Sequence, residues 1–218
     1  MIAENLQVLL KSLPQNVQLI AVSKTKPMEA LEEAYQAGQR HFGENKIQEM
    51  ADKFEALPKD IHWHMIGHVQ DNKIKYMAPF VSLVHGMDKE KRLKALNKEA
   101  GKNNRVIDCL VQVHIAEEES KFGFDYAEAE ALFQKNLAEV YPNIRVRGLM
   151  GMATFTDDQA QLKREFNGLL NFYKSTQAHL GPDQFNILSM GMSGDYPLAI
   201  ECGSNMIRVG TKIFGARA

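Results

Sequence analysis

Short apolar runs rich in β-branched residues alternate with longer amphipathic segments along nearly the whole chain, and this alternation most limits the possible folds. The pattern is typical of parallel strands joined by helices. About eight strand and helix alternations are present, which is the repeat number of a closed (β/α)8 barrel. The sequence therefore predicts an α/β protein built as a single TIM barrel with an extra amino-terminal helix. A doubly wound open sheet is the alternative.

The boundaries of the predicted elements follow from the apolar periodicity and from glycines that end helices. Strands are predicted at 18–23, 41–43, 62–67, 81–85, 106–114, 144–150, 185–190 and 205–209. Helices are predicted at 27–38, 44–57, 88–100, 125–140 and 157–180. No Pro/Gly/Ser-rich linker or internal repeat divides the chain. We expect residues 1–218 to form one domain.

Composition excludes several classes of protein. The 218 residues carry 26 Lys and Arg against 27 Asp and Glu, a net charge of -1 that gives no overall attraction to nucleic acid or anionic membranes. No apolar run is long enough for a membrane span, and the first residues lack a signal-peptide pattern. Cys109 and Cys202 are expected to be buried thiols. We expect a cytoplasmic, monomeric protein.

Lys24 is the first candidate functional residue, because it directly follows the predicted strand at 18–23. Residues at the carboxyl ends of barrel strands form the working face of this fold. Partial desolvation there favours the neutral amine, which is the form that makes a Schiff base with an aldehyde. The alternative is that Lys24 extends into solvent, and Lys26 is a second cation whose role stays open.

Two glycine-containing turns follow the last two predicted strands. Ser193 and Gly194 belong to the first turn, and Gly210 and Thr211 to the second. Backbone N–H groups at these positions form the recurrent phosphate site of TIM barrels. The alternative for Ser193 is that it caps the following helical segment at 196–200.

Arg208 lies within the last predicted strand, where alternation places it on the same face as Met206. If that face is the barrel interior, the guanidinium needs an acceptor there, such as a carboxylate, a phosphate or a ring nitrogen. If the face is the outer one, Arg208 pairs with a helix carboxylate. The spacing alone leaves both open.

His62, His64 and His68 form a third group of candidates. Paired histidines at this spacing occur in zinc hydrolases built on barrels, which need further ligands from other strand ends. Asp88 and Asp195 are conceivable ligands, but neither lies in a ligand motif. We expect packing and hydrogen bonding from these histidines, and no metal site.

Six segments together resemble one known family. They are AVSKTKP (21–27), FGENKIQE (42–49), WHMIGHVQDNK (63–73), KFGF (121–124), RGLMGM (147–152) and LSMGMSGDYPLAIECGSNMIRVGTKIFGAR (188–217). In this order they resemble the pyridoxal phosphate homeostasis protein family, whose barrel is similar to the amino-terminal domain of alanine racemase. The chain departs from the family pattern at Lys46, His114 and Asn205.

The resemblance implies a fold type III barrel that holds pyridoxal 5'-phosphate (PLP) as a Schiff base on Lys24. It also implies that Ser193, Gly210 and Thr211 hold the phosphate. Arg208 would face the pyridine nitrogen, and Asn45 would lie near the phenolic oxygen. An arginine cannot deliver a proton to that nitrogen, so the ring would be a weak electron sink.

The function implied is therefore intracellular PLP homeostasis, with delivery to apo-enzymes that use PLP, and with no catalytic residue of the chain's own. Two alternatives remain. One is a monomeric racemase-like PLP enzyme, in which Tyr196 or His68 would act as the acid opposite Lys24. We expect no second proton-donating domain after Ala218. The other alternative is a metal-dependent hydrolase based on His62 and His64.

Overall fold

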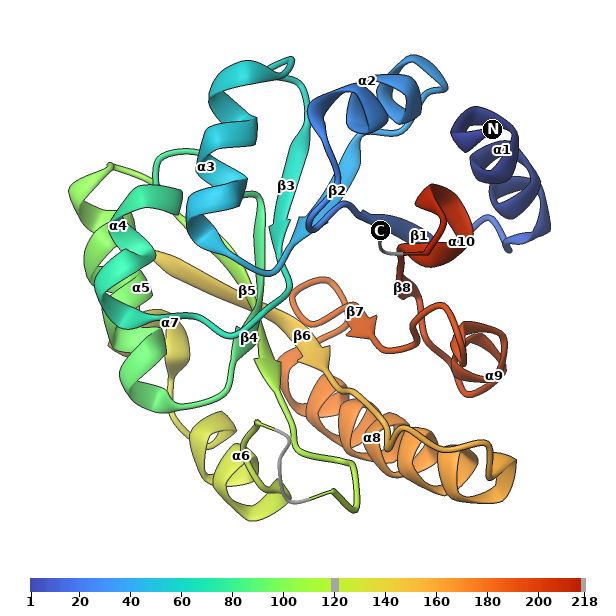
Figure 1. The fold of residues 1–218 in the computed structure, drawn as a ribbon. Coiled ribbons are helices and arrows are strands. Elements are labelled where there is room, and N and C mark those ends of the chain that lie inside the picture. The colour runs from blue at the N-terminus through green and yellow to red at the C-terminus, as the bar shows by residue number, and fades with distance from the viewer. Residues whose placement is uncertain (119–121, 217–218) are drawn as a thin grey trace.

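The computed structural model describes residues 1–118 and 122–216, and shows a closed barrel. Eight parallel strands pair in chain order, and the first also pairs with the last (Figure 1). They are β1 (Gln18–Val22), β2 (His41–Glu44), β3 (His62–Met65), β4 (Leu83–Met87), β5 (Ile107–Gln112), β6 (Ile144–Met150), β7 (Ile187–Ser189) and β8 (Met206–Val209). The predicted (β/α)8 barrel is confirmed, and the open-sheet alternative is wrong. Lys121 and Arg217, which belong to the family-like segments, lie outside the described residues.

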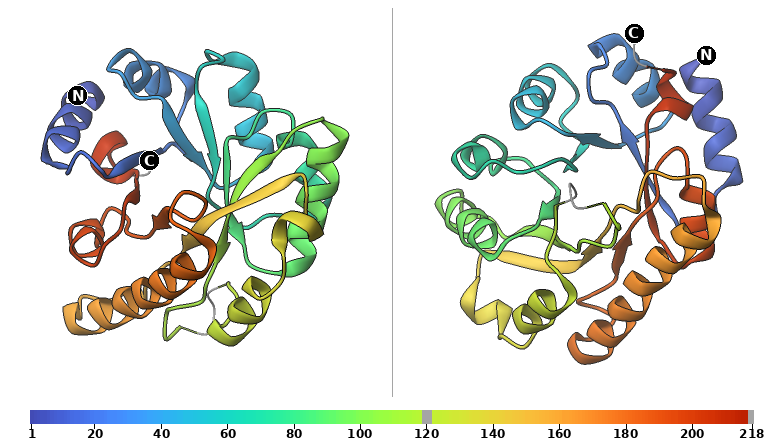
Figure 2. Two further views of the ribbon diagram at one scale, coloured as in Figure 1. Left: turned by 180° about the vertical axis from the view of Figure 1, so that it is seen from behind. Right: turned by 60° about the horizontal axis from the view of Figure 1, so that its bottom comes forward.

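Helices surround the strands on the outside of the barrel (Figures 1 and 2). They are α1 (Ile2–Ser12), α2 (Met28–Gln36), α3 (Ile47–Ala56), η1 (Asp71–Lys73), α4 (Ile74–Met77), α5 (Glu90–Lys102), α6 (Tyr126–Phe133), α7 (Leu137–Val140), α8 (Gln159–Leu180), α9 (Tyr196–Glu201) and α10 (Thr211–Phe214). The extra amino-terminal helix is α1. Asn5 Nδ2 donates to the carbonyl oxygen of Ile213 at 3.2 Å, which joins α1 to α10. The two ends of the chain are thereby brought to one side of the barrel.

Strand alternation separates two apolar clusters. Leu19, Phe42 and Trp63 belong to the larger cluster, which packs the strands against the surrounding helices. Ile20 and Met206 belong to a smaller cluster that fills the barrel interior with side chains of the opposite strand face. Because successive residues alternate between these layers, the position of each polar side chain follows from its register along the strand.

Most predicted boundaries differ from the observed ones by one to three residues, and two of the differences have a visible cause. The helix predicted at 125–140 breaks at Asn136, whose backbone (φ −73, ψ 88) leaves the helical region between α6 and α7. The Asn136 side chain donates to Glu139 Oε2 at 3.2 Å and makes no capping bond to the backbone of α7. The strand predicted at 81–85 is observed two residues later, as β4 (Leu83–Met87). Val81 is not part of it, because its N–H donates to the carbonyl of Met77 at the end of α4, a helix that was not predicted.

Both cysteines are free and buried, as predicted. In the part of the chain that the structure describes, no helix has the length and apolarity needed to cross a membrane.

Candidate functional site

A cavity of about 620 Å³ lies at the carboxyl ends of the strands. Its lining residues lie in or after β1, β2, β3, β5, β6, β7 and β8. This volume is typical of sites for small organic ligands. All six residues singled out from the sequence line the cavity: Lys24, Asn45, Ser193, Arg208, Gly210 and Thr211.

Lys24 is half-buried and follows β1, on the strand face that carries Ile20 and Val22 toward the interior. The next residue, Thr25, has a φ of 64°, a left-handed conformation that is strained for a β-branched residue. Two bonds hold the turn in this conformation. The Lys26 N–H donates to the carbonyl of Ser23 at 3.0 Å, and the Thr25 N–H donates to Glu49 Oε1 at 2.6 Å.

A buried charged cluster lies behind this turn, between β1, β2 and α3. The ammonium of Lys53 donates to Glu44 Oε1 at 2.7 Å, to Glu49 Oε1 at 2.8 Å and to the carbonyl of Ser23 at 2.8 Å. The Ser23 hydroxyl donates to the same Glu44 oxygen at 2.6 Å. Glu44 is fully buried, and its Oε2 has no hydrogen-bond partner. The cluster therefore fixes the turn that carries Lys24.

Burial raises the pKa of Glu44 from 4.5 to about 7, although Lys53 and Ser23 oppose the shift. Between these pH values the folded state binds more protons than the unfolded state. Its free energy of unfolding therefore falls as the pH rises, by roughly 3 kcal/mol in all. We expect Glu44→Gln to remove this dependence in urea unfolding measured at several pH values, with exposed Glu29→Gln as the control. Parallel curves for Glu44→Gln and the parent would contradict the prediction.

Arg208 faces the barrel interior, and its side chain is almost fully buried. NH1 donates to Ser189 Oγ at 2.6 Å, and NH2 donates to the carbonyl of Gly151 at 3.1 Å. Burial lowers the pKa of Arg208 to about 10, which leaves it charged at neutral pH. The alternative of an outward-facing Arg208 is wrong, and a cation held by neutral acceptors lines the cavity.

The two glycine turns meet beside Lys24. The Gly210 N–H donates to Ser193 Oγ at 3.2 Å, and α10 begins at Thr211. A Cβ at Gly210 would lie only 3.0 Å from the carbonyl oxygen of Val22, so the close approach of β8 to β1 favours glycine here. The alternative role of Ser193 as a helix cap is not observed, because Asp195 occupies the N-cap position of α9.

Asn45 follows β2, the strand between β1 and β3, and lines the cavity. A Cβ at Gly67 would lie 2.5 Å from the carbonyl oxygen of Asn45. The glycine therefore allows the ends of β2 and β3 to approach closely, which positions Asn45 at the cavity wall.

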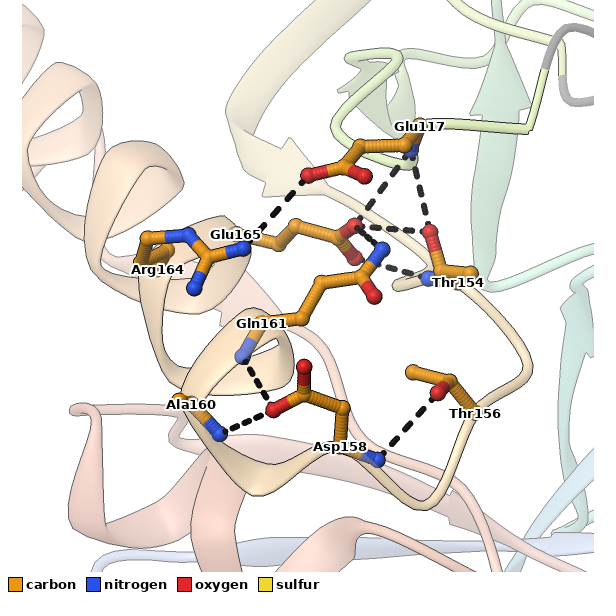
Figure 3. Close-up of polar contacts among 8 residues, drawn as sticks. All are labelled: Glu117, Thr154, Thr156, Asp158, Ala160, Gln161, Arg164 and Glu165. Atoms are coloured by element: carbon orange, nitrogen blue, oxygen red, sulfur yellow. Dashed lines mark hydrogen bonds and ion pairs between the residues drawn. The ribbon is translucent and has the colours of Figure 1, made fainter.

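A second buried carboxylate holds the loop after β6 against the cavity (Figure 3). Glu165 of α8 accepts hydrogen bonds from the Thr154 N–H and hydroxyl, both at 2.7 Å, and from the Glu117 N–H at 3.3 Å. Asp158 caps α8 by accepting from the N–H groups of Ala160 and Gln161. These bonds fix the cavity wall from which Thr154 projects.

The histidine candidates do not converge. His62 is exposed, whereas His64 is buried and contacts other histidines through both ring nitrogens. His68 lines the cavity and lies 3.0 Å from Arg92 NH2 and 3.5 Å from Asp88. Within residues 1–118 and 122–216, no group of three or more His, Cys, Asp or Glu side chains is arranged to hold a metal ion.

Lys26 also lines the cavity, but its ammonium donates to the carbonyl oxygens of Phe214, Gly215 and Ala216 at 2.9–3.3 Å. It therefore fastens the segment after α10 to the Lys24 turn. His114 and Asn205, where the sequence departs from the family pattern, contact the backbone instead of lining the cavity.

Sequence reasoning missed the residues that support the site: Ser23, Glu44, Lys53, Glu165 and Ser189. Of these, Ser23 directly precedes Lys24, and Glu44 directly precedes Asn45. Their position next to predicted site residues could have identified them. Lys53 and Glu165 belong to amphipathic helices in which charged residues are ordinary, and no sequence signal separates them from solvated ones.

Three comparisons relate this geometry to known proteins. The family model "Alanine racemase, N-terminal domain" matches residues 1–218. The pyridoxal phosphate homeostasis protein of Haemophilus influenzae is 40% identical over 204 residues, covering 92% of this chain and 85% of that protein. The corresponding protein of Vibrio alginolyticus is 41% identical over 209 residues, covering 94% and 88%.

Among solved structures, PipY of Synechococcus elongatus without PLP has a TM-score of 0.93 and is 37% identical, covering 99% of this chain and all of that one. PipY with PLP bound has a TM-score of 0.87 and is 36% identical, with the same coverage. A related protein with the same barrel fold thus holds PLP in its solved structure.

Proposed function

This chain belongs to the pyridoxal phosphate homeostasis protein family, and from its cavity we propose that it binds PLP covalently through Lys24 and passes it to other proteins. The observation that carries the proposal is the convergence of Lys24, the buried Arg208 and the two glycine turns on one cavity. The bound PLP of the related PipY supports it.

The residues present fit this cofactor chemically. PLP combines an aldehyde, a pyridine nitrogen and a phosphate on one small ring. The cavity offers the amine of Lys24, the guanidinium of Arg208 and the hydroxyls of Ser193 and Thr211. Arg208 is the strongest argument for fit, because its observed partners inside the barrel are neutral oxygens. A buried cation of this kind is stabilised further by an acceptor in the cavity.

Each residue has one role in this proposal. Lys24 supplies the amine that bonds the aldehyde carbon. Ser193, Gly210 and Thr211 would hold the phosphate, and Asn45 would donate to the phenolic oxygen. Arg208 would donate a hydrogen bond to the ring nitrogen.

When bound, the cofactor supplies a reversible carbonyl linkage and a ring that can withdraw electrons. Because the guanidinium of Arg208 keeps its proton at neutral pH, it would not protonate the ring nitrogen and would limit that withdrawal. The arrangement suits storage and release better than amino-acid chemistry. We also propose that the protein acts as a monomer in the cytoplasm.

Transfer to an apo-enzyme tests the delivery proposal. The PLP-loaded protein is mixed with a PLP-dependent apo-enzyme while a phosphatase removes free PLP, and recovered enzyme activity is measured. We expect faster recovery than with the same amount of free PLP under the phosphatase. Equal recovery with free PLP would contradict delivery.

A racemase-like enzyme is the second candidate. Of the two residues considered as the acid opposite Lys24, His68 lines the cavity and Tyr196 does not. His68 lies between Asp88 and Arg92, so its imidazole is held in place. Solvent deuterium exchange at the α-carbon of L- and D-amino acids separates the two functions. Exchange no faster than that caused by free PLP supports the carrier, and exchange well above it supports the enzyme.

Lys26 is proposed as a second amine for the aldehyde during transfer. In this role, the Lys26 ammonium must leave its three carbonyl partners and lose a proton, because only the neutral amine attacks an aldehyde. Unchanged loading and release rates in Lys26→Ala would remove the relay.

A further inference from the structure

A line of hydrogen bonds runs from Arg208 through the barrel interior to its opposite end. Ser189 Oγ accepts from Arg208 NH1 and lies 3.1 Å from His85 Nδ1. His85 Nε2 lies 3.0 Å from His64 Nδ1, and His64 Nε2 lies 3.0 Å from His41 Nδ1. The ring of His41 is only half-buried. The line therefore starts at the cavity and ends near solvent.

The hydrogen-bonding chemistry of the groups favours one order of the protons. A guanidinium can only donate, so Ser189 Oγ is an acceptor toward Arg208. Among the described residues, His85 Nδ1 is the acceptor within reach of the Ser189 hydroxyl, so the arrangement that pairs this hydrogen has Ser189 donating to His85. A neutral imidazole that accepts at Nδ1 donates at Nε2. In this order, His85 Nε2 donates to His64 Nδ1, and His64 Nε2 donates to His41 Nδ1.

All three imidazoles are suited to remain neutral. Burial holds the pKa values of His64 and His85 well below their ordinary value, and burial with neighbouring His62 lowers that of His41 to about 4. Their titratable neighbours lower the pKa further, because Arg208 beside His85 is a cation and each neighbouring histidine would repel a second positive charge. No carboxylate of the described residues contacts the three rings.

We propose that Ser189, His85 and His64 are positioning residues for Arg208, and that the hydrogen bonds among them run in one direction, from Ser189 to His41. In this order, the Ser189 hydroxyl donates to His85, which leaves the lone pairs of Ser189 Oγ for Arg208. Each hydrogen bond polarises the next one, so the bond from Arg208 to Ser189 becomes stronger. The effect on PLP binding rests on the proposed function, whereas the proton order does not.

Nitrogen-15 NMR of histidine-labelled, cofactor-free protein tests the proton order. We expect His41, His64 and His85 to be neutral with the hydrogen on Nε2, and to stay so from about pH 5 to 8. A hydrogen on Nδ1 of His64 or His85, or a change of charge within that range, would overturn the proposal. This measurement uses no PLP, so it tests the proton order even if the protein does not bind PLP.

A matched pair of variants tests the positioning role. Gln at position 85 can accept from Ser189 and donate to His64, whereas Leu can do neither. We expect His85→Leu and Ser189→Ala to weaken PLP binding by about tenfold or more and His85→Gln to keep most of the affinity. Exposed His179→Gln is the control.

Equal PLP affinity in His85→Leu, His85→Gln and the parent would overturn the positioning role. If His85→Leu does not fold, the affinity of Ser189→Ala and the proton positions in the parent protein still decide the question. If the parent itself fails to bind PLP, the proposed function is lost while the proton order is judged separately.

Discussion

Lys24→Ala is expected to abolish covalent PLP binding. The variant mixed with PLP should show none of the visible absorbance of a lysine-bound imine, and dialysis should remove the cofactor. The physical reason is that the C=N bond needs the amine of residue 24. The remaining contacts from Arg208 and the glycine turns provide only reversible noncovalent binding.

Lys26→Ala is the matched control, because Lys26 lies two residues away and lines the same cavity. Its ammonium is held by backbone carbonyls, so we expect the absorbance of the parent protein in this variant. Persistent, dialysis-resistant absorbance in Lys24→Ala, or its loss in Lys26→Ala, would contradict the assignment.

Lys53→Met is expected to cause the largest loss of stability. It leaves the buried carboxylate of Glu44 without its ion-pair partner and removes a bond to the backbone of Ser23. Breaking a buried pair in this way costs about 3–5 kcal/mol. Because Glu44 can take up a proton instead, the loss should be smaller below its raised pKa than above it. Urea unfolding at about pH 5 and pH 8 measures both values.

Two further variants identify the cause of that loss. Exposed Lys98→Met should change the free energy of unfolding by no more than about 0.5 kcal/mol. The double variant with Lys53→Met and Glu44→Gln should recover part of the stability, because no buried charge at residue 44 is left unpaired. A double variant no more stable than Lys53→Met would mean that packing, and not charge, sets the cost.

The barrel could be predicted because its strands are short, apolar and regularly spaced, and the same regularity placed Lys24 at a strand end. Arg208 was left open, since alternation assigns a residue to a face but does not say which face is the interior. Observed contacts among Ile20, Leu83 and Met206 identify that face. The break at Asn136 was missed because amphipathic periodicity continues across it.

The supporting residues could not be predicted, because they depend on contacts between distant strands. Ser189 and His85 are 104 residues apart along the chain, yet they meet inside the barrel. His64 was noticed as half of a histidine pair, and its apparent partner His62 turned out to be exposed. The spacing of His62 and His64 along one strand therefore suggested a metal site. In the closed barrel, His64 instead contacts His41 and His85 on the neighbouring strands.

Borohydride reduction of the PLP-loaded protein followed by peptide mass mapping tests the central claim most directly, because reduction makes the linkage to the amine permanent. The expected result is one pyridoxyl group, located on Lys24. A pyridoxyl group on a different lysine, or none at all after PLP has been added, would contradict the role given to Lys24.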